Sequence, residues 1–345
     1  MTKKLLPLIV IFLASACTNK DNAPDVSDVK VILGVQRFDK DFFAIDTVSI
    51  ERDIPALQVK YPSLLPLFLQ TIVGVQNATG VKDFYARYKP VYDSSAKLYN
   101  DFDPVRRQIE KGFKYAKYYF PTYQLPSNIV TVVGPMNSRE DLARMRNGDY
   151  TPDFMGPDFI GVSLQFYLGK DFSLYQHQYF VNNVAPLYIS RRFGKEYIVA
   201  DVLKLVAEDI FPDNSKGRPL IEQMIEKGKQ WWLLDKFLPG EPDSVKTGYT
   251  ASQLEWCENN EGLIWSYIIK NEDLYSVNPV TLQTYIGDSP FTPVFPQENS
   301  PGNIGQWIGW QIVKKFEEKN GSMKTTDIMT AAPVKILEGA KYKPK

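Results

Sequence analysis

The residues with the clearest capacity for chemistry are two glutamates on one predicted helix. Residues 251–270 have helical periodicity, and Thr250 with Gln253 forms a capping-box pattern at the start. Glu258 and Glu261 fall inside the apolar stripe of this helix rather than opposite it. Two carboxylates on a core-facing surface are costly unless they are paired, protonated or bound to a metal ion. They predict either structural ion pairs or a polar cleft in which a carboxyl group acts as an acid or base.

A second polar stripe lies on the predicted helix at residues 198–211. Apolar residues occupy most of its circumference, and Asp201, Lys204 and Glu208 fill a narrow polar sector. A helix of this kind is buried on most sides. The sector is either a solvated edge with a Lys204–Glu208 ion pair, or part of a polar cleft. The candidate polar cleft is therefore made up of five residues from the two helices: Asp201, Lys204, Glu208, Glu258 and Glu261.

Two tryptophans form the third group, on the predicted helix at residues 302–318. Trp307 and Trp310 lie in a polar sector of this helix, beside Lys314. Large aromatic side chains in such a sector are either covered by another layer or form a binding surface. The proline-rich loop at 289–301 could supply the covering layer. Otherwise, the two tryptophans and Lys314 form a candidate surface for a partner.

Glycines on the same helix predict an unusually close contact. Gly305 and Gly309 share one face with Ile308 and Ile312. Glycines four residues apart allow another backbone to approach closely. We therefore expect another stretch of backbone to lie close to this face.

Composition excludes several kinds of site. The single histidine, His177, excludes any zinc centre that needs two or three imidazoles. Its context, YQHQYF, is typical of a surface or hydrogen-bonding histidine. Lys and Arg number 40 against 40 Asp and Glu, without a basic cluster, so we expect no nucleic-acid partner. We also expect no metal and no cofactor.

A cysteine near the start of the chain predicts attachment to a membrane. Two lysines precede an apolar run at residues 5–13, which is too short to span a bilayer as a stable helix. Small residues at 14–16 then lead to Cys17, as in a bacterial lipoprotein signal peptide. We expect residues 1–16 to be removed and acyl chains to be attached to Cys17. Cys257 would then be the sole remaining thiol, which excludes an intramolecular disulfide.

The remaining elements predict the fold class. Residues 17–28 are polar and aperiodic, and we expect a flexible tether followed by a single domain at 29–345. Besides the helices above, the pattern predicts strands at 29–36, 128–134 and 159–168, a short helix within RFDKDFF, and helices at 48–60, 63–76, 79–88 and 104–119. This order predicts a helix-rich α+β fold, with one small mixed sheet packed against many helices. No stretch after the signal approaches eighteen apolar residues, so the acyl chains are the expected membrane attachment.

Several unusual stretches together resemble one family. They are VQRFDKDFF (35–43), KYYFP (117–121), YLGKDF (167–172), GYTASQLEWCENNE (248–261), SPGNIGQWIGWQIV (300–313) and KYKPK (341–345). With the signal peptide, they resemble the gliding-motility lipoproteins of Bacteroidota, the GldB family, from one end of the mature chain to the other. The resemblance implies a lipid-anchored cell-envelope protein that is needed for gliding over surfaces and has no established enzymatic activity or cofactor.

The resemblance also implies partners and a location. The expected partners are the membrane, through the lipid on Cys17, and other envelope or gliding-machinery proteins. The segment TNKDNA after Cys17 carries a single acidic residue. This composition favours an outer-membrane position facing the periplasm.

The order of elements is also similar to that of zinc metallopeptidases with an HExxH helix. The helix at 198–211 would take that place, but it has no histidine. The fold would then be a metallopeptidase-like scaffold that has lost its metal site.

Three functional hypotheses follow from these observations. The chain is a non-catalytic envelope component that binds a partner, a hydrolase that uses Glu258 or Glu261 in a cleft, or a peptide-binding module derived from a peptidase. Two glutamates one turn apart are poorly placed to flank a scissile bond. This spacing favours the non-catalytic component.

Overall fold

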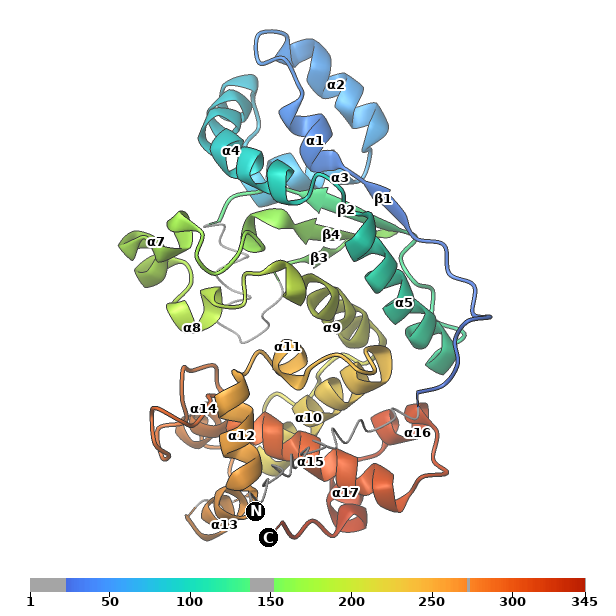
Figure 1. Ribbon diagram of the computed structural model, residues 1–345, viewed down its shortest axis with the longest axis vertical. Helices are drawn as coiled ribbons and strands as arrows, with labels where there is room; N and C mark the ends of the chain where they lie inside the picture. The colour runs from blue at the N-terminus through green and yellow to red at the C-terminus, as the bar shows by residue number, and fades with distance from the viewer. Residues whose placement is uncertain (1–22, 137–151, 272–273, 345) are drawn as a thin grey trace, which may run out of the picture.

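The structure is a computed structural model that describes residues 23–136, 152–271 and 274–344. It has two halves, which lie one above the other in Figure 1. The sheet half, residues 23–210, contains the strands and the helices around them. The helical half, residues 211–344, contains the remaining helices. One hydrophobic core runs through both halves.

The sheet half alternates strands with helices. Its strands are β1 (Gly34–Gln36), β2 (Asn128–Val132), β3 (Phe154–Met155) and β4 (Phe159–Ser163). Its α-helices are α1 (Phe38–Phe43), α2 (Ile50–Lys60), α3 (Leu64–Pro66), α4 (Ala78–Leu98), α5 (Asp103–Tyr119), α7 (Gln178–Asn183), α8 (Leu187–Ser190) and α9 (Ile198–Ile210). A π-helix, η1 (Leu67–Val73), and three short 3₁₀ helices, η2 (Leu164–Phe166), η3 (Ser173–Gln176) and η4 (Lys195–Tyr197), complete it.

The helical half contains no strand among the described residues. Its helices are α10 (Leu220–Phe237), α11 (Asp243–Thr247), α12 (Ala251–Asn259), α13 (Glu261–Asn271), α14 (Pro279–Ile286), α15 (Ile304–Lys319), α16 (Thr325–Thr330) and α17 (Pro333–Ala340).

Within the described residues, the sheet has four strands in the order β1-β2-β4-β3. β1, β2 and β4 are parallel, with Ile129 opposite both Val35 and Ile160. β3 runs antiparallel to β4, with Phe154 opposite Gly161. Parallel strands need long crossovers, and helices α1 to α5 lie in the one between β1 and β2. The predicted helix-rich α+β fold with one small mixed sheet is confirmed.

Several element boundaries differ from the sequence predictions. The predicted first strand keeps only its last three residues, and the predicted strand at 159–168 becomes helical after Ser163. The predicted helix at 79–88 continues to Leu98 through Pro90, because buried Val91 and Ser95 extend its core-facing stripe. The capping box of Thr250 is confirmed.

Aromatic rings fill the core of the sheet half. Phe42 of α1 is completely buried and meets the rings of Phe68 and Phe84 edge to face, at centroid distances of 5.4 and 5.8 Å. Phe38 contacts Phe68 in the same way at 4.9 Å. Such pairs add to the free energy of burying the rings. The predicted short helix in RFDKDFF is therefore confirmed, and it lies at the centre of this cluster.

Two helices of the helical half cross with their backbones in contact. A Cβ atom added to Gly309 of α15 would overlap the carbonyl oxygen of Met224 in α10. A Cβ atom added to Gly228 of α10 would overlap the backbone of Gly309 in turn. The close approach predicted at Gly309 is confirmed, and it requires glycine on both helices.

A buried lysine joins α10 to the end of the chain. Lys229 is only 2% exposed. Its Nζ donates to the carbonyl oxygens of Met329 and Ala331, at 3.0 and 2.7 Å, and pairs with Glu226 at 2.9 Å. Burial lowers the pKa of Lys229, and Glu226 opposes that effect. The contact fixes the end of α16 against α10.

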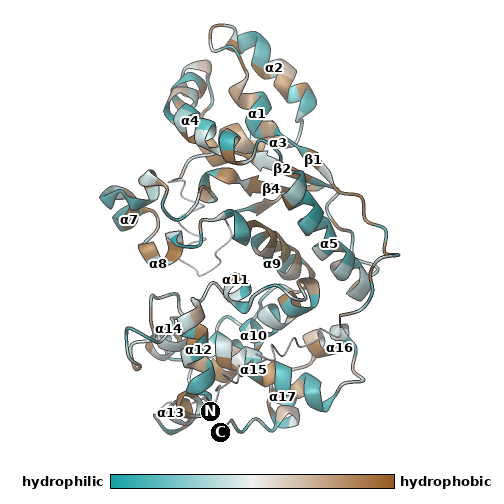
Figure 2. Cartoon of the chain, in the orientation of Figure 1, coloured by the Kyte–Doolittle hydropathy of each residue, from teal (hydrophilic) through white to brown (hydrophobic). Residues whose placement is uncertain are grey.

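Helix α9 lies at the interface between the two halves. Figure 2 shows it as a largely hydrophobic helix, and it packs against α5, β4 and α10. Val202, Leu203 and Val206 are completely buried. The prediction that this helix is buried on most sides is confirmed. Because both halves pack on it, α9 also sets the position of the polar residues that it carries.

None of the described helices is by itself long and apolar enough to span a membrane. The segment Leu64–Val73 and α4 meet the criterion together, but a bend of 78° separates them. Cys17 and the predicted signal at residues 1–16 lie outside the described residues.

Candidate functional site

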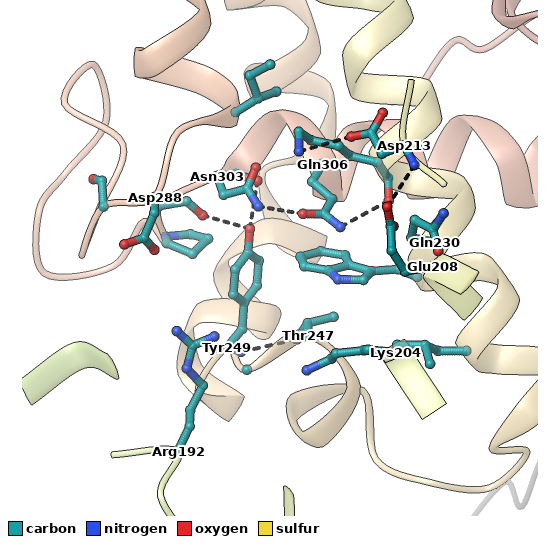
Figure 3. A pocket seen from close by; sticks show the side chains of 18 of the residues that line it. Arg192, Lys204, Glu208, Asp213, Gln230, Thr247, Tyr249, Asp288, Asn303 and Gln306 are labelled. Carbon is teal, nitrogen blue, oxygen red and sulfur yellow. Dashed lines mark hydrogen bonds and ion pairs between the residues drawn. The ribbon is translucent and has the colours of Figure 1, made fainter. Parts of the chain in front are cut away.

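A cavity of about 480 Å³ lies between the two halves. β3, the end of α8 and α9 line it from the sheet half. α10, the segments after α11 and α14, and the start of α15 line it from the helical half. Figure 3 shows that polar side chains from both halves project into this space. Ligand pockets typically measure roughly 300–1,000 Å³, so the cavity is the candidate binding site.

The polar sector of α9 forms part of the cavity wall. Lys204 and Glu208 both line the cavity, whereas Asp201 lies behind Lys204 and is 5% exposed. Lys204 pairs with Asp201 at 2.9 Å, and Glu208 accepts a hydrogen bond from the backbone N–H of Asp213 at 2.9 Å. The predicted Lys204–Glu208 pair is therefore wrong. The chain turns back after α9 and brings a backbone donor to Glu208, so Lys204 pairs with the carboxylate one turn earlier.

A buried tyrosine fixes Asp201 in turn. The hydroxyl of Tyr167 lies 2.8 Å from Asp153 Oδ2 and 3.1 Å from Asp201 Oδ2. The two carboxylates therefore share the single hydrogen that this hydroxyl can donate. Burial, followed by the charges of Asp153 and Asp201, raises the pKa of Tyr167 well above its ordinary value. The phenol therefore stays protonated. This network holds the ammonium group of Lys204 at one position on the wall.

Two adjacent arginines extend the same wall. Arg191 is half-buried and donates to the carbonyl oxygen of Gly248 at 2.8 Å and to Gln253 Oε1 at 3.2 Å, both of which are neutral acceptors. Burial, and then the charge of Arg192, lower the pKa of Arg191. Arg192 lies against Gly248, whose φ of 73° and lack of a Cβ atom allow the contact. This end of the cavity therefore carries two guanidinium groups.

Amide side chains form the opposite wall, at the start of α15. Asn303 has φ 54° and ψ 35°, a left-handed conformation that is rare outside glycine. Its Nδ2 donates to Gln306 Oε1 at 2.5 Å, and Gln306 Nε2 donates to the carbonyl oxygen of Lys227 at 3.0 Å. Asn303 Oδ1 is inaccessible to water and has no hydrogen-bond partner among the described residues. The wall thus contains a strained residue with an unsatisfied acceptor.

An ion pair closes this wall. Lys227 Nζ lies 3.3 Å from Asp213 Oδ2. Burial raises the pKa of Asp213, but its hydrogen bonds with Ser215 and the charge of Lys227 outweigh burial, and the net shift is downward. Asp213 is therefore ionised at neutral pH. Like Lys204, Lys227 meets a carboxylate of this chain within the wall.

The glutamates that the sequence placed in the cleft lie elsewhere. Neither lines the cavity: Glu258 is exposed, and Glu261 is half-buried and accepts a hydrogen bond from the hydroxyl of Tyr342. The prediction that both face the core is wrong. The expected single helix breaks at Asn260 into α12 and α13, so one helical wheel cannot describe both glutamates.

The predicted partner surface on α15 is also wrong. Trp307 and Trp310 are 2% and 1% exposed, because α10, α14 and α17 enclose this helix. Trp310 meets the ring of Trp231 edge to face and donates to Asp235 Oδ2 at 2.8 Å. Lys314 is half-buried, with its Nζ 3.3 Å from the centroid of the Trp310 ring. These side chains are structural, so the alternative of a covering layer holds.

The remaining residues with chemical potential lie away from the cavity. His177 is exposed, as predicted, and its Nδ1 accepts a hydrogen bond from the backbone of Tyr179 at the start of α7. Cys257 is completely buried, and burial raises the pKa of its thiol. Among the described residues, no group of three or more His, Cys, Asp or Glu side chains is placed to hold a metal ion.

Sequence reasoning missed the arginine pair and the amide wall. Arg191 and Arg192 are adjacent in an otherwise aromatic and apolar segment, a local signal that was visible. Asn303 lies in SPGNIGQ, an unusual stretch that contributed to the family resemblance. Neither segment by itself indicates that the two meet across one cavity, because their meeting depends on how the two halves pack together.

The described residues form a helix-rich α+β fold with one small mixed sheet and a cavity between its two halves. The sequence profile of the family described as gliding motility protein GldB matches residues 19–344, which is nearly the whole chain. The chain belongs to this family. It is therefore a cell-envelope lipoprotein of the gliding-motility type. No curated protein and no solved structure matches the chain significantly.

Proposed function

We propose that this protein is a non-enzymatic, lipid-anchored component of the gliding machinery, which binds a segment of another envelope protein in the cavity between its halves. Its acylated Cys17 holds it at the outer membrane, facing the periplasm. The observation that carries the proposal is the cavity itself. It lies in a chain that matches the GldB family over nearly its full length.

The state of the polar groups in the cavity supports binding rather than catalysis. Lys204 and Lys227 are neutralised by Asp201 and Asp213, and Glu208 accepts a backbone hydrogen bond. Groups held in this way form a fixed recognition surface, because their charges and directions are set before a ligand arrives. A general acid or base instead needs a pKa tuned to its task.

The alternative is a hydrolase that uses Glu258 and Glu261. The positions of these residues give it less support, because neither lines the cavity. We expect the purified protein to leave unfolded casein and peptidoglycan fragments intact. Cleavage that a cavity-blocking substitution abolishes would contradict the non-enzymatic role.

The membrane anchor is tested with Cys17→Ala. We expect the unaltered protein to fractionate with membranes and to carry diacylglycerol at its N-terminus by mass spectrometry. The variant should lose the modification and leave the membrane fraction. An unmodified N-terminus on membrane-bound protein would contradict the proposed anchor.

The role of the cavity is tested with Leu205→Trp in cells that lack the native protein. Leu205 lines the cavity, so a larger side chain fills it. Leu263→Trp is the control, because Leu263 is 59% exposed on α13. Both variants should fold and remain membrane-bound, and only Leu205→Trp should reduce colony spreading. Normal spreading with a folded Leu205→Trp variant would refute the role of the cavity.

A further inference from the structure

We propose that a basic surface at the end of the chain, formed by Lys319, Lys341 and Lys343, rests on the anionic phospholipid headgroups of the membrane that holds the protein. We call these three residues the lysine surface. The inference rests on the proposed lipid anchor, and it adds the orientation of the folded chain on the bilayer.

The distance between the proposed anchor and the folded chain limits where the membrane lies. The described chain begins at Ala23, which is exposed. Cys17 lies six residues earlier, and a chain of this length spans at most about 22 Å. A bilayer that holds acyl chains on Cys17 therefore passes close to Ala23, and the surface that meets the bilayer lies near the start of the described chain.

Both ends of the described chain lie at the helical half of the molecule. Figure 1 shows the start of the described chain at the height of α16 along the longest axis, although these residues belong in sequence to the sheet half. The chain ends below α17, at the far end of the helical half. An anchor near the start of the described chain therefore brings the helical half to the bilayer, with the sheet half pointing away from it.

The last part of the helical half has an excess of positive charge. Residues 319–344 contain five lysines and two acidic residues, Asp327 and Glu338, whereas basic and acidic residues are equal in number in the whole chain. All three residues of the lysine surface are exposed, and none has an ion-pair partner among the described residues. The nearby Lys315, in contrast, pairs with Glu318 at 2.6 Å. The charges of the lysine surface are therefore available to an external anion.

Contacts within the fold hold the lysine surface together. The Nζ of Lys319, at the end of α15, donates to the carbonyl oxygen of Ala340 at 2.6 Å, so this lysine lies where α17 ends. The segment that follows α17 is fixed by Tyr342, whose hydroxyl donates to Glu261. The other two lysines of the surface flank this tyrosine in the chain. The fold thus presents the three ammonium groups at one place, which suits a surface that carries many phosphate groups.

Attraction of this kind adds to the effect of a lipid anchor. Each lysine near an anionic lipid surface strengthens the attachment roughly fivefold. The attraction falls off within a Debye length, which is about 10 Å in 0.1 M salt. Acyl chains combined with a basic patch are a recognised pair of membrane signals. The lysine surface would therefore hold the protein in one orientation on anionic lipid, where the acyl chains alone allow many.

The backbone of Lys341 offers a way to test the surface without damaging the fold. Lys341 is the C-cap residue of α17, with φ 45° and ψ 48°. Glycine adopts this left-handed conformation readily, whereas other residues are strained in it. We therefore expect Lys341→Gly to fold at least as stably as the unaltered protein while it removes one charge from the lysine surface.

The first experiment locates the membrane on the full acylated protein. With Cys17 acylated and Cys257 completely buried, a cysteine introduced at an exposed site reacts selectively with a fluorophore. Ser322→Cys places the fluorophore three residues from Lys319, and Val48→Cys places it just before α2, at the opposite end of the molecule. The vesicles contain phosphatidylethanolamine and phosphatidylglycerol, with nitroxide-labelled headgroups as quenchers. We expect severalfold stronger quenching at residue 322 than at residue 48.

The lipid composition and the salt concentration test the electrostatic nature of the contact. Quenching at residue 322 should fall severalfold in vesicles of phosphatidylcholine and at high salt, because both weaken the attraction. Vesicle-bound protein without quenching at residue 322, or with equal quenching in neutral vesicles, would overturn the inference and leave the lipid anchor intact. Protein that lacked acyl chains and did not bind vesicles would overturn both, so the two failures are distinguishable.

The second experiment removes charge from the lysine surface. Lys341→Gly combined with Lys343→Gln should lower the ratio of resting to lifted orientations about fivefold for each lysine, measured as a loss of quenching at residue 322. Lys82→Gln combined with Lys97→Gln, at two exposed lysines of α4, is the matched control and should leave the quenching unchanged. Circular dichroism checks that both variants fold. Equal quenching in the two variants would overturn the role of the lysine surface.

Discussion

The sheet half and the helical half fill their interiors in different ways. Around Phe42 the sheet half packs aromatic rings edge to face, so side chains determine the spacing of its elements. In the helical half, α10 and α15 meet backbone to backbone at Gly228 and Gly309. Neighbouring side chains can partly relax around a lost ring, whereas two touching backbones cannot move apart without separating the helices. We therefore expect the sheet half to be most sensitive to substitutions that remove side-chain volume, and the helical half to be sensitive to substitutions that add it.

Removing a ring from the sheet half should have the largest effect. Phe42→Ala empties a completely buried site, so we expect a loss of about 3–5 kcal/mol in the free energy of unfolding. Val48→Ala, at a position that is 86% exposed, should change it by less than about 0.5 kcal/mol. Urea unfolding followed by circular dichroism measures both. A similar small change in the two variants would show that the aromatic cluster is not the core of this half.

Adding a single methyl group should damage the helical half. Gly309→Ala forces a Cβ atom into the carbonyl oxygen of Met224, and we expect a loss of about 1–3 kcal/mol. Gly321→Ala is the matched control, because a Cβ atom there meets no neighbouring atom. The same urea experiment compares them. If Gly309→Ala were as stable as its control, the two backbones would not be in contact.

A buried ion pair of the helical half predicts a dependence on pH. Lys246 is 6% exposed and contacts Asp235 and Asp243 at 2.5 and 2.8 Å. Burial lowers the pKa of Lys246, but the two carboxylates raise it more, so it lies above the ordinary 10.5. The stabilisation is fully present below that unfolded value and is lost as pH rises through the higher folded value. Lys246→Met should cost about 1–3 kcal/mol at neutral pH.

The measurement for this prediction is urea unfolding between about pH 8 and about pH 12. The difference between the unaltered protein and Lys246→Met should shrink as the pH rises. Lys335→Met, at an exposed lysine of α17, is the control and should show a small difference throughout. A difference that stayed constant up to the highest pH would contradict a charged contact.

The smallest effects are expected at the two glutamates of α12 and α13. Glu258→Gln changes an exposed side chain and should alter the free energy of unfolding by less than about 0.5 kcal/mol. Glu261→Gln weakens the hydrogen bond from Tyr342 and should cost about 1 kcal/mol. Thermal unfolding at neutral pH compares the two variants. A larger loss of unfolding free energy for Glu258→Gln than for Glu261→Gln would indicate that Glu258 is buried, as the sequence predicted.

The features that could be predicted from the sequence are local or depend on one helix face. The capping box of Thr250 needs only four consecutive residues, and the contact at Gly309 follows from glycine spacing on an unbroken helix. The predicted burial of Glu258 was wrong because the helical wheel was extended across the break at Asn260. Periodicity is thus informative only within a continuous helix.

The candidate site was only partly predictable, for a different reason. Lys204 and Glu208 were found because the polar sector of α9 is local. Arg191 and Asn303 were missed because they lie on different halves, more than a hundred residues apart, and meet only when the halves pack. The tryptophans of α15 were left between two alternatives, because a helical wheel does not show that three other helices enclose this one.

The lysine that joins α10 to the end of α16 determines how this chain can be shortened. A protein ending before residue 324 would lack the carbonyl oxygens of Met329 and Ala331, and the ammonium of Lys229 would lose two of its three partners. Leaving a buried charge without partners costs more than losing exposed chain. Truncation there would therefore destabilise α10, which lines the cavity. Residues 324–331 thus support the helix that lines the cavity, although they lie far from the cavity in the sequence.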